Sequence, residues 1–279
     1  MIRLQVEHDG ELLPFLLEHT DYSRNKIKSL LKYRNVSVGN QILTRYDTYL
    51  KKGQVVTISL EKKETKIGKI DIIYEDEHYL VVNKPSGMLT IATEKEKNRT
   101  LYHFVREYVK KKNKHQKIFI VHRLDQDTCG IVLFSKDESL KQKLQGHWDQ
   151  VAMKREYTAV VVGILANKKD KLVSYLKENQ RNIVYSTKDK SGKLAITSYE
   201  VKKENHNSLL SIVIETGRKN QIRVQLNDIG HPIIGDRKYG NVKSKKLLLC
   251  ANCLWIKDPL TSKVMKFEIH YPREFIKNV

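Results

Sequence analysis

The sequence predicts an α+β fold dominated by a mixed, largely antiparallel sheet. Short β-branched and aromatic runs recur from Ile70 onward, and few long helical patterns lie between them. Strands therefore outnumber helices and do not alternate regularly with them, which argues against a doubly wound dinucleotide fold. The chain also contains no glycine-rich phosphate loop of the dinucleotide or P-loop type.

The 279 residues are enough for one large domain or two modest ones. A polar tract of alternating charge, Glu61 to Lys69, marks a seam between two units. We therefore expect a small α/β domain at residues 1–62, a linker at 63–69 and a larger domain at 70–279.

The first sixty residues predict two short helices followed by small strands. Apolar residues favour a helix over Glu11 to His19, and Ser23 is a good N-cap for a second helix over Asn25 to Tyr33. Ile27, Leu30 and Leu31 share one face of that second helix, so its lysines point outward. Strands are expected at Val36 to Val38 and at the end of the stretch 50–58.

Apolar patterns in the larger domain predict the remaining elements. Helices are expected at residues 100–111, 138–147 and 221–229. The principal strands are expected at 70–74, 79–82, 118–121, 131–134, 154–162, 195–199 and 209–214.

The charge indicates a polyanionic partner. Lys and Arg outnumber Asp and Glu by 52 to 32, a formal net charge of +20. A protein this basic attracts nucleic acid through counterion release. A lysine-rich surface without a nucleic-acid partner would also give a high pI. No apolar run approaches the ~20 residues of a membrane span, and charges interrupt the N-terminus. We therefore expect a cytoplasmic protein with no membrane partner, and a monomer.

The three cysteines, Cys129, Cys250 and Cys253, predict buried thiols in a reducing compartment. Cys250 and Cys253 have the spacing of a zinc or redox motif, but no second pair lies at partner spacing. A zinc site is the weaker alternative, and no metal or cofactor is expected.

The most informative segment is a polar loop between two apolar runs. Residues 121–130 read VHRLDQDTCG, and strands are expected on either side of them. Rigid strands can hold an aspartate with little positional freedom, as catalysis requires. Asp125 is therefore the first candidate for a catalytic residue.

Four other motifs have ordinary structural explanations when each is taken alone. The segment 83–90 is a turn after a strand, and Tyr157 in KREY is a core tyrosine. Arg218 and Arg223, in the segment 215–225, are surface charges around a helix start, and the segment 230–240 is a glycine-punctuated loop.

Taken together and in order, the motifs resemble the RluA/RluD-type pseudouridine synthases. The resemblance runs from about residue 70 to 276 and rests on Lys84-Pro85-x-Gly87, His122-Arg123-Leu124-Asp125, Lys154-x-x-Tyr157, Thr216-Gly217-Arg218-x-x-Gln221-Ile222-Arg223 and Gly230-His231-Pro232…Gly235-Asp236-x-x-Tyr239-Gly240. Residues 10–60 resemble the S4 RNA-binding domain, which recurs in this family. The other explanation is a generic small α/β unit with a lysine-rich face.

The resemblance implies the pseudouridine synthase fold and the isomerisation of uridine in structured RNA, most commonly large-subunit ribosomal RNA, without a cofactor. It implies that Asp125 is the essential aspartate, that Tyr157 stacks on the target uracil and that Arg223 pairs with the aspartate. Attack on the sugar, attack on the base and a glycal intermediate stay open. The expected RNA contacts are Arg123, His122, Arg218, Lys84, Arg24 and Lys28.

Three residues depart from the family pattern. Cys129 stands where many relatives have serine, and Asn220 and Gln225 stand where they have histidine. Two alternatives stay open: a catalytically silent RNA-binding or ribosome-assembly factor, and an enzyme that modifies transfer RNA. A glycosidase using Asp125 and Asp127 fits poorly, because both carboxylates lie in one loop.

Overall fold

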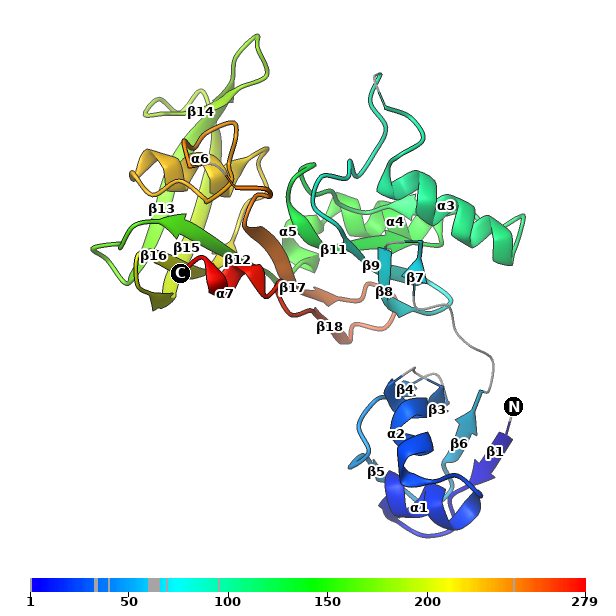
Figure 1. Cartoon of the computed structure of the whole chain (residues 1–279). Helices are drawn as coiled ribbons and strands as arrows, with labels where there is room; N and C mark the ends of the chain where they lie inside the picture. Colours follow the sequence, from blue (N-terminus) through cyan, green and yellow to red (C-terminus); the bar gives the residue numbers. More distant parts are fainter. Residues whose placement is uncertain are drawn as a thin grey trace. The chain divides into compact units, whose positions relative to one another are not determined.

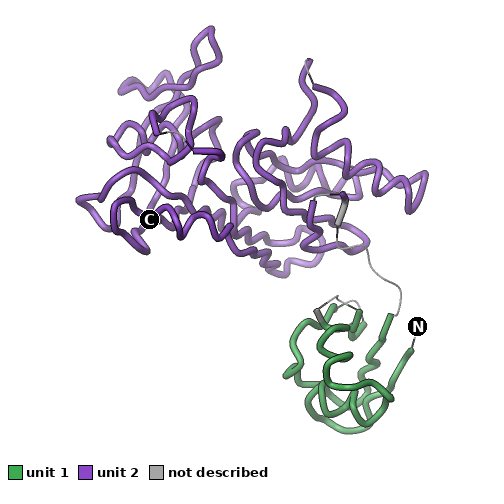
Figure 2. Tube along the Cα trace, in the orientation of Figure 1, with its two compact units in different colours: residues 1–65 green, residues 66–279 purple. Residues whose placement is uncertain are grey.

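The computed structural model describes residues 2–32, 35–39, 41–59, 66–68, 70–94, 96–242 and 244–279. The chain forms two compact units, residues 1–65 and 66–279 (Figure 2). Most of the tract expected as a linker, 63–69, lies outside the described residues, and Lys66–Ile67 within it is strand β7. No helix within these described ranges is both long and apolar enough to cross a membrane.

The first unit contains two helices and a small antiparallel sheet of order β1-β6-β3-β4, with a separate β2-β5 pair. Its elements are β1 (Ile2–Gln5), β2 (Gly10–Glu11), α1 (Leu12–His19), α2 (Arg24–Lys32), β3 (Val36–Val38), β4 (Gln41–Leu43), β5 (Tyr49–Leu50) and β6 (Val55–Ile58).

Helix α2 forms as its sequence predicts. The Ser23 hydroxyl accepts a hydrogen bond from Lys26 N at 3.3 Å, which satisfies one of the free N–H groups at the helix start. Ile27, Leu30 and Leu31 are buried against α1 and the sheet. Arg24 and Lys28 of the same helix are exposed.

The second unit is built on one mixed sheet, as predicted, of order β14-β13-β15-β16-β12-β17-β11-β9-β8-β7, with β10 beside β11 and β18 beside β17. Among the strands of this unit that the structure describes, β11 and β17 pair in parallel and the other pairs are antiparallel. The remaining elements are β8 (Ile70–Glu75), β9 (Tyr79–Lys84), α3 (Leu101–Lys112), β10 (Phe119–Ile120), β11 (Cys129–Ser135), α4 (Glu138–Gly146), α5 (Trp148–Val151), β12 (Lys154–Val162), β13 (Lys169–Glu178), β14 (Val184–Thr187), β15 (Lys193–Glu204), β16 (Asn207–Ile214), α6 (Gln221–Asp228), β17 (Leu249–Lys257), β18 (Val264–Glu268) and α7 (Glu274–Lys277).

The helices of this unit lie over two halves of the sheet. Helices α3 and α4 lie by β8, β9 and β11, while α6 lies by β13 to β15 (Figure 1). Each half has its own apolar cluster, one around α3 and one around α6. The side chain of Tyr157, on the central strand β12, packs against both clusters. Tyr157 therefore lies where the two halves meet.

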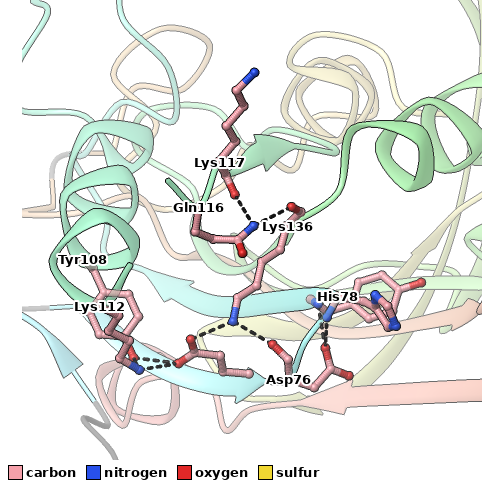
Figure 3. Close-up of polar contacts among 9 residues, drawn as sticks. Asp76, His78, Tyr108, Lys112, Gln116, Lys117 and Lys136 are labelled. Atoms are coloured by element: carbon pink, nitrogen blue, oxygen red, sulfur yellow. Dashed lines mark hydrogen bonds and ion pairs between the residues drawn. The ribbon is translucent and has the colours of Figure 1, made fainter. Parts of the chain in front are cut away.

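A polar network attaches helix α3 to strand β8 of the sheet (Figure 3). The Glu75 carboxylate accepts hydrogen bonds from the Tyr108 hydroxyl at 2.6 Å, Lys136 Nζ at 2.9 Å and Lys112 Nζ at 3.1 Å. Burial opposes its ionisation, but these donors hold the pKa of Glu75 below its ordinary value. The network is therefore charged and fixes the position of α3 at neutral pH.

The β13–β14 hairpin was not predicted. Charged residues occupy both ends of strand β13, half of its ten residues are exposed and one is buried, so it lacks the apolar run of a core strand. It forms because β15 and β14 pair with it on either side. The prediction of buried thiols is confirmed, since Cys129, Cys250 and Cys253 are all free and buried.

Gly130 allows three strands to meet directly after the loop that carries Asp125. It pairs with Lys84 of β9 and with Ala251 of β17, and its φ is +122°. A Cβ atom at this position would lie 2.2 Å from the Ala251 carbonyl oxygen, a distance that only backbone movement can relieve. The close approach of β11 to β17 thus requires glycine.

We expect Gly130→Ala to lower the free energy of unfolding by about 3 kcal/mol or more, because both the positive φ and the backbone clash oppose the new methyl group. Equilibrium urea unfolding measures the difference. Gly146→Ala is the matched control: it lies at the end of α4 with nothing within 4 Å, so it should change the value by less than about 1 kcal/mol. Equal losses in both variants would contradict the steric argument.

Candidate active site

The side chain of Lys84 holds the loop that carries Asp125 from the interior of the protein. This side chain is fully buried, and its ammonium donates to the carbonyl oxygens of Met88 and Gln126 at 2.8 Å and of Pro85 at 3.1 Å. Burial lowers the pKa of Lys84 to about 8. The expected contact between Lys84 and RNA is wrong, because the amine lies inside the protein and joins the turn after β9 to the catalytic loop.

Two hydroxyl groups from the same turn hold the loop on either side of Asp125. The Thr90 hydroxyl donates to the Leu124 carbonyl at 2.6 Å, and the Ser86 hydroxyl donates to the Asp127 carbonyl at 2.7 Å. The segment 83–90 is therefore more than a turn, since its side chains fix the backbone immediately before and after the aspartate.

Asp125 lies in a cavity of about 90 Å³ and is mostly shielded from solvent. The cavity is lined by Arg123, Leu124, Asp125, Thr128, Tyr157, Ile214, Gly217, Arg218, Asn220, Gln221, Ile222, Arg223 and Leu249. Burial raises the pKa of the Asp125 carboxyl above its ordinary value, against the opposing charges of Arg223, Arg123, Lys238 and Lys84. The surrounding cations thus offset part of the cost of holding a carboxylate in this cavity.

Tyr157 contributes an aromatic ring and a neutral hydroxyl to the same cavity. It follows a bulge in the pairing of β12 with β17, located between Glu156 and Tyr157. Bulges change the direction of a side chain relative to the regular strand. Burial raises the pKa of Tyr157 to about 12, so its hydroxyl is protonated at neutral pH.

Arg223 lies on the buried face of α6 and lines the cavity, but it pairs with a different carboxylate from the one expected. Its Nε and Nη2 donate to the two oxygens of Asp236 at 2.7 and 2.6 Å. The expected ion pair with Asp125 is therefore replaced by this buried pair, and Arg223 lowers the pKa of Asp125 only by its nearby charge. Asp236 was part of a recognised motif, but nothing in the sequence indicated its partner.

The start of α6 is fixed to β15 by the side chain of Gln221. Its amide nitrogen donates to Ile196 O at 3.0 Å and to the Thr197 hydroxyl at 2.9 Å. Its amide oxygen accepts from the Thr216 hydroxyl at 2.8 Å and from Arg218 N at 3.0 Å. All the polar atoms of this buried amide are therefore used to position the helix that carries Arg223.

The other predicted RNA contacts have different surroundings. Arg123 and Arg218 are exposed at the cavity, where a polyanion can reach them. His122 is partly buried, accepts from Leu133 N at 3.1 Å and stacks on Trp148, so it supports the loop rather than reaching outward. Burial lowers its pKa to about 4, and its ring is neutral. Arg24 and Lys28 belong to the first unit.

A carboxylate, a phenol and a guanidinium thus line one small cavity at the junction of two halves of a sheet, with exposed arginines at its edge. This arrangement is typical of an enzyme that acts on an anionic substrate. No group of three or more His, Cys, Asp or Glu side chains suited to a metal ion occurs among the described residues.

The chain belongs to the RNA pseudouridylate synthase family, whose sequence model matches residues 78–228. It is 31% identical to the uncharacterized RNA pseudouridine synthase YhcT of Bacillus subtilis, over 100% of this chain and 95% of that protein. The ribosomal large subunit pseudouridine synthase D of Pseudomonas aeruginosa is 27% identical, over 92% of this chain and 86% of that protein. The protein is accordingly an RNA pseudouridine synthase, an isomerase.

A solved structure of the human RNA pseudouridylate synthase domain containing 4 has the same fold. The two superpose with a TM-score of 0.62 over 74% of this chain and 90% of that chain, at 20% identity. The predicted family and fold are therefore confirmed.

We expect Lys84→Met to lower the free energy of unfolding by about 2–4 kcal/mol, because three carbonyl oxygens lose their buried donor. At a temperature where the variant is folded, its dissociation constant for RNA should match that of the wild type, while its turnover is slower. Filter binding and single-turnover rates measure the two effects. The exposed Lys190→Met is the control and should change neither. Weaker RNA binding at unchanged stability would restore a direct RNA contact for Lys84.

Proposed function

We propose that the protein isomerises a uridine of large-subunit ribosomal RNA to pseudouridine, with Asp125 as the catalytic carboxylate. One observation supports the assignment of Asp125: its carboxylate lines the same cavity as Tyr157, Arg123 and Arg223. Asp127 lies in the same loop but is exposed.

The reaction breaks the bond between ribose C1′ and uracil N1, turns the base and joins C5 to C1′. The C5 proton leaves and N1 gains one, so the atoms balance without an oxidant or a co-reactant. A carboxylate that faces C1′ in this cavity can attack the sugar or stabilise positive charge that develops there. The enclosed space retains the detached uracil and limits hydrolysis.

Tyr157 and Arg223 have complementary roles in this proposal. The Tyr157 ring offers a flat apolar surface to the uracil, and its protonated hydroxyl can donate to or exchange a proton with the base. Arg223, fixed by Asp236, supplies a positive charge that favours the ionised form of Asp125. Arg123 and Arg218 at the edge of the cavity would bind phosphates of the flipped-out nucleotide and its neighbours.

The choice of target rests on named relatives. Proteins of Pseudomonas aeruginosa and Vibrio cholerae named ribosomal large subunit pseudouridine synthase D are 27% and 28% identical to this chain. Mapping pseudouridines in total RNA with and without the gene tests this target. Loss of a site in large-subunit ribosomal RNA is the expected result, and a loss confined to transfer RNA would redirect the proposal.

We also propose that residues 1–62 form an S4-like RNA-binding domain. Two helices precede a small antiparallel sheet, and Arg24 and Lys28 are exposed on the second helix. Lys28 Nζ lies 5.8 Å from the centre of the exposed Tyr46 ring. Cations beside an exposed aromatic ring suit contacts with phosphates and unpaired bases.

We expect Asp125→Asn to abolish pseudouridine formation while RNA binding persists, because only the charge is removed. Burial raises the pKa of Asp125, so ionisation costs stability as the pH rises through that pKa. At neutral pH the Asn variant should therefore be at least as stable as the wild type. Pseudouridine mapping, RNA binding and thermal unfolding measure the three quantities.

Asp127→Asn is the matched control, with the same change of charge in the same loop. It should retain pseudouridine formation within about threefold. A fully active Asp125→Asn enzyme, or an equal loss in both variants, would show that Asp125 is not the catalytic carboxylate.

We expect the double variant Arg24→Ala/Lys28→Ala to bind RNA more weakly and to reduce the slope of log K against log salt by up to about 2, since each phosphate contact releases a counterion. The control Lys257→Ala/Lys263→Ala removes the same charge near the β17–β18 turn. An identical slope in both double variants would reject an RNA-binding role for the exposed face of α2.

A further inference from the structure

Asn220 makes a contact with Asp125 that the assigned roles leave unused. With its amide nitrogen toward the carboxylate, Asn220 donates to Asp125 Oδ2 at 2.7 Å. Its amide oxygen then accepts from the Tyr239 hydroxyl at 2.8 Å and from Lys238 Nζ at 3.2 Å. The opposite orientation would place the amide oxygen against a carboxylate oxygen and the amide nitrogen against an ammonium group, so both contacts would be repulsive.

The neighbours of Tyr239 support this orientation. Its hydroxyl oxygen already accepts a hydrogen bond from Val184 N at 3.2 Å. The hydroxyl proton is therefore available for an acceptor, and the amide oxygen of Asn220 provides one. The orientation reverses the direction of the 2.8 Å hydrogen bond between Asn220 and the Tyr239 hydroxyl, and it gives up a marginal 3.5 Å contact between Asn220 and Arg223. A continuous chain of hydrogen bonds thus joins β14, Tyr239, Asn220 and Asp125.

The backbone of Asn220 indicates that its side chain serves this contact rather than its own helix. Asn220 is the N-cap residue of α6, yet its side chain makes no capping hydrogen bond. Asparagine at an N-cap ordinarily accepts from an N–H group of the first turn. Its φ is +54°, a left-handed conformation that asparagine tolerates better than most residues, and the side chain is buried.

We propose that Asn220 is a positioning residue that sets the orientation and the charge of Asp125. Its N–H fixes one carboxylate oxygen, so the other is directed into the cavity. A hydrogen bond to the ionised form also favours ionisation and opposes the effect of burial. The neutral amide of Asn220 thus stabilises the charged carboxylate in place of a direct ion pair, because Arg223 is already paired with Asp236. The inference rests on the proposed catalytic role of Asp125.

Two substitutions separate the contact from the fold. Asn220→Gly removes the amide and adopts the positive φ without strain. Asn220→Asp keeps the shape and its contacts with Tyr239 and Lys238, but it places a second carboxylate against Asp125. The pKa of Asp125 should rise by about 1 unit in the Gly variant and by about 2 units in the Asp variant. Ser262→Gly is the control: it has a φ of +59°, is exposed, lies before β18 and away from the cavity, and should change nothing.

Two measurements test the expected change in the pKa of Asp125. Carboxyl ¹³C resonances of aspartate-labelled protein give the pKa of Asp125, assigned with Asp125→Asn. Single-turnover pseudouridine formation, on total RNA from cells that lack the gene, gives the pH profile. Its acid limb should move upward with the pKa, so that each unit lowers the rate on that limb about 10-fold. Tyr239→Phe, which removes one donor to the amide oxygen of Asn220, should give a smaller shift in the same direction.

Raised pKa values of Asp125 in the Asn220→Gly and Asn220→Asp variants, with Ser262→Gly at the wild-type value, support the inference. An unchanged pKa of Asp125 in both variants overturns the inference, even if activity falls. That result would show that Asn220 supports the fold without favouring the charged form of the carboxyl group. Should the Asp variant fail to fold, the Gly and Tyr239→Phe variants decide by the same criterion. A wild-type protein that forms no pseudouridine rejects the proposed function, and the carboxyl titration still decides the role of Asn220.

Discussion

The candidate active site depends on keeping one carboxylate, that of Asp125, charged in a sheltered cavity. Burial alone raises the pKa of Asp125, so the surroundings must supply charges and donors that favour its ionised form. Arg223, Arg123, Lys238 and Lys84 provide the charges. Three of these side chains are themselves held: Arg223 by Asp236, Lys238 by the carbonyl of Asn182 and Lys84 by three carbonyls. The site is thus preorganised by residues that do not face the substrate.

The site lies where strands β11, β12 and β17 meet. The loop with Asp125 leads into β11, Tyr157 lies on β12, and β17 pairs with both of these strands. The parallel contact of β11 with β17 needs Gly130, because a larger residue would collide with the Ala251 backbone. Helix α6 brings Arg223 and Asn220 from the other half. Residues far apart in the sequence therefore meet at one junction.

Buried polar groups in this site make up connected networks. Gln221 satisfies all its polar atoms between α6 and β15, and Asn220 is held between Tyr239 and Lys238. When one member of such a network is missing, a buried polar group is left without a partner and the protein is destabilised. A complete network favours one arrangement of the side chains. This is why substitutions near Asp125 are expected to act through its pKa and its orientation as well as through direct contact.

The sequence by itself determined the α+β class, the helices α1 to α4 and α6, and the order of the motifs that identify the family, because these depend on local periodicity and on residue types. It also indicated Asp125 and Tyr157 as candidate site residues, and both line one cavity of the structure. Only the tertiary structure decided the side-chain partners, which are Asp236 for Arg223 and Asp125 for Asn220. It also decided the burial of Lys84 and the pairing of the β13–β14 hairpin. The reason is physical. A side chain's donors and charges are satisfied by whichever groups folding brings within hydrogen-bond distance, and neither residue type nor spacing in the chain specifies those neighbours.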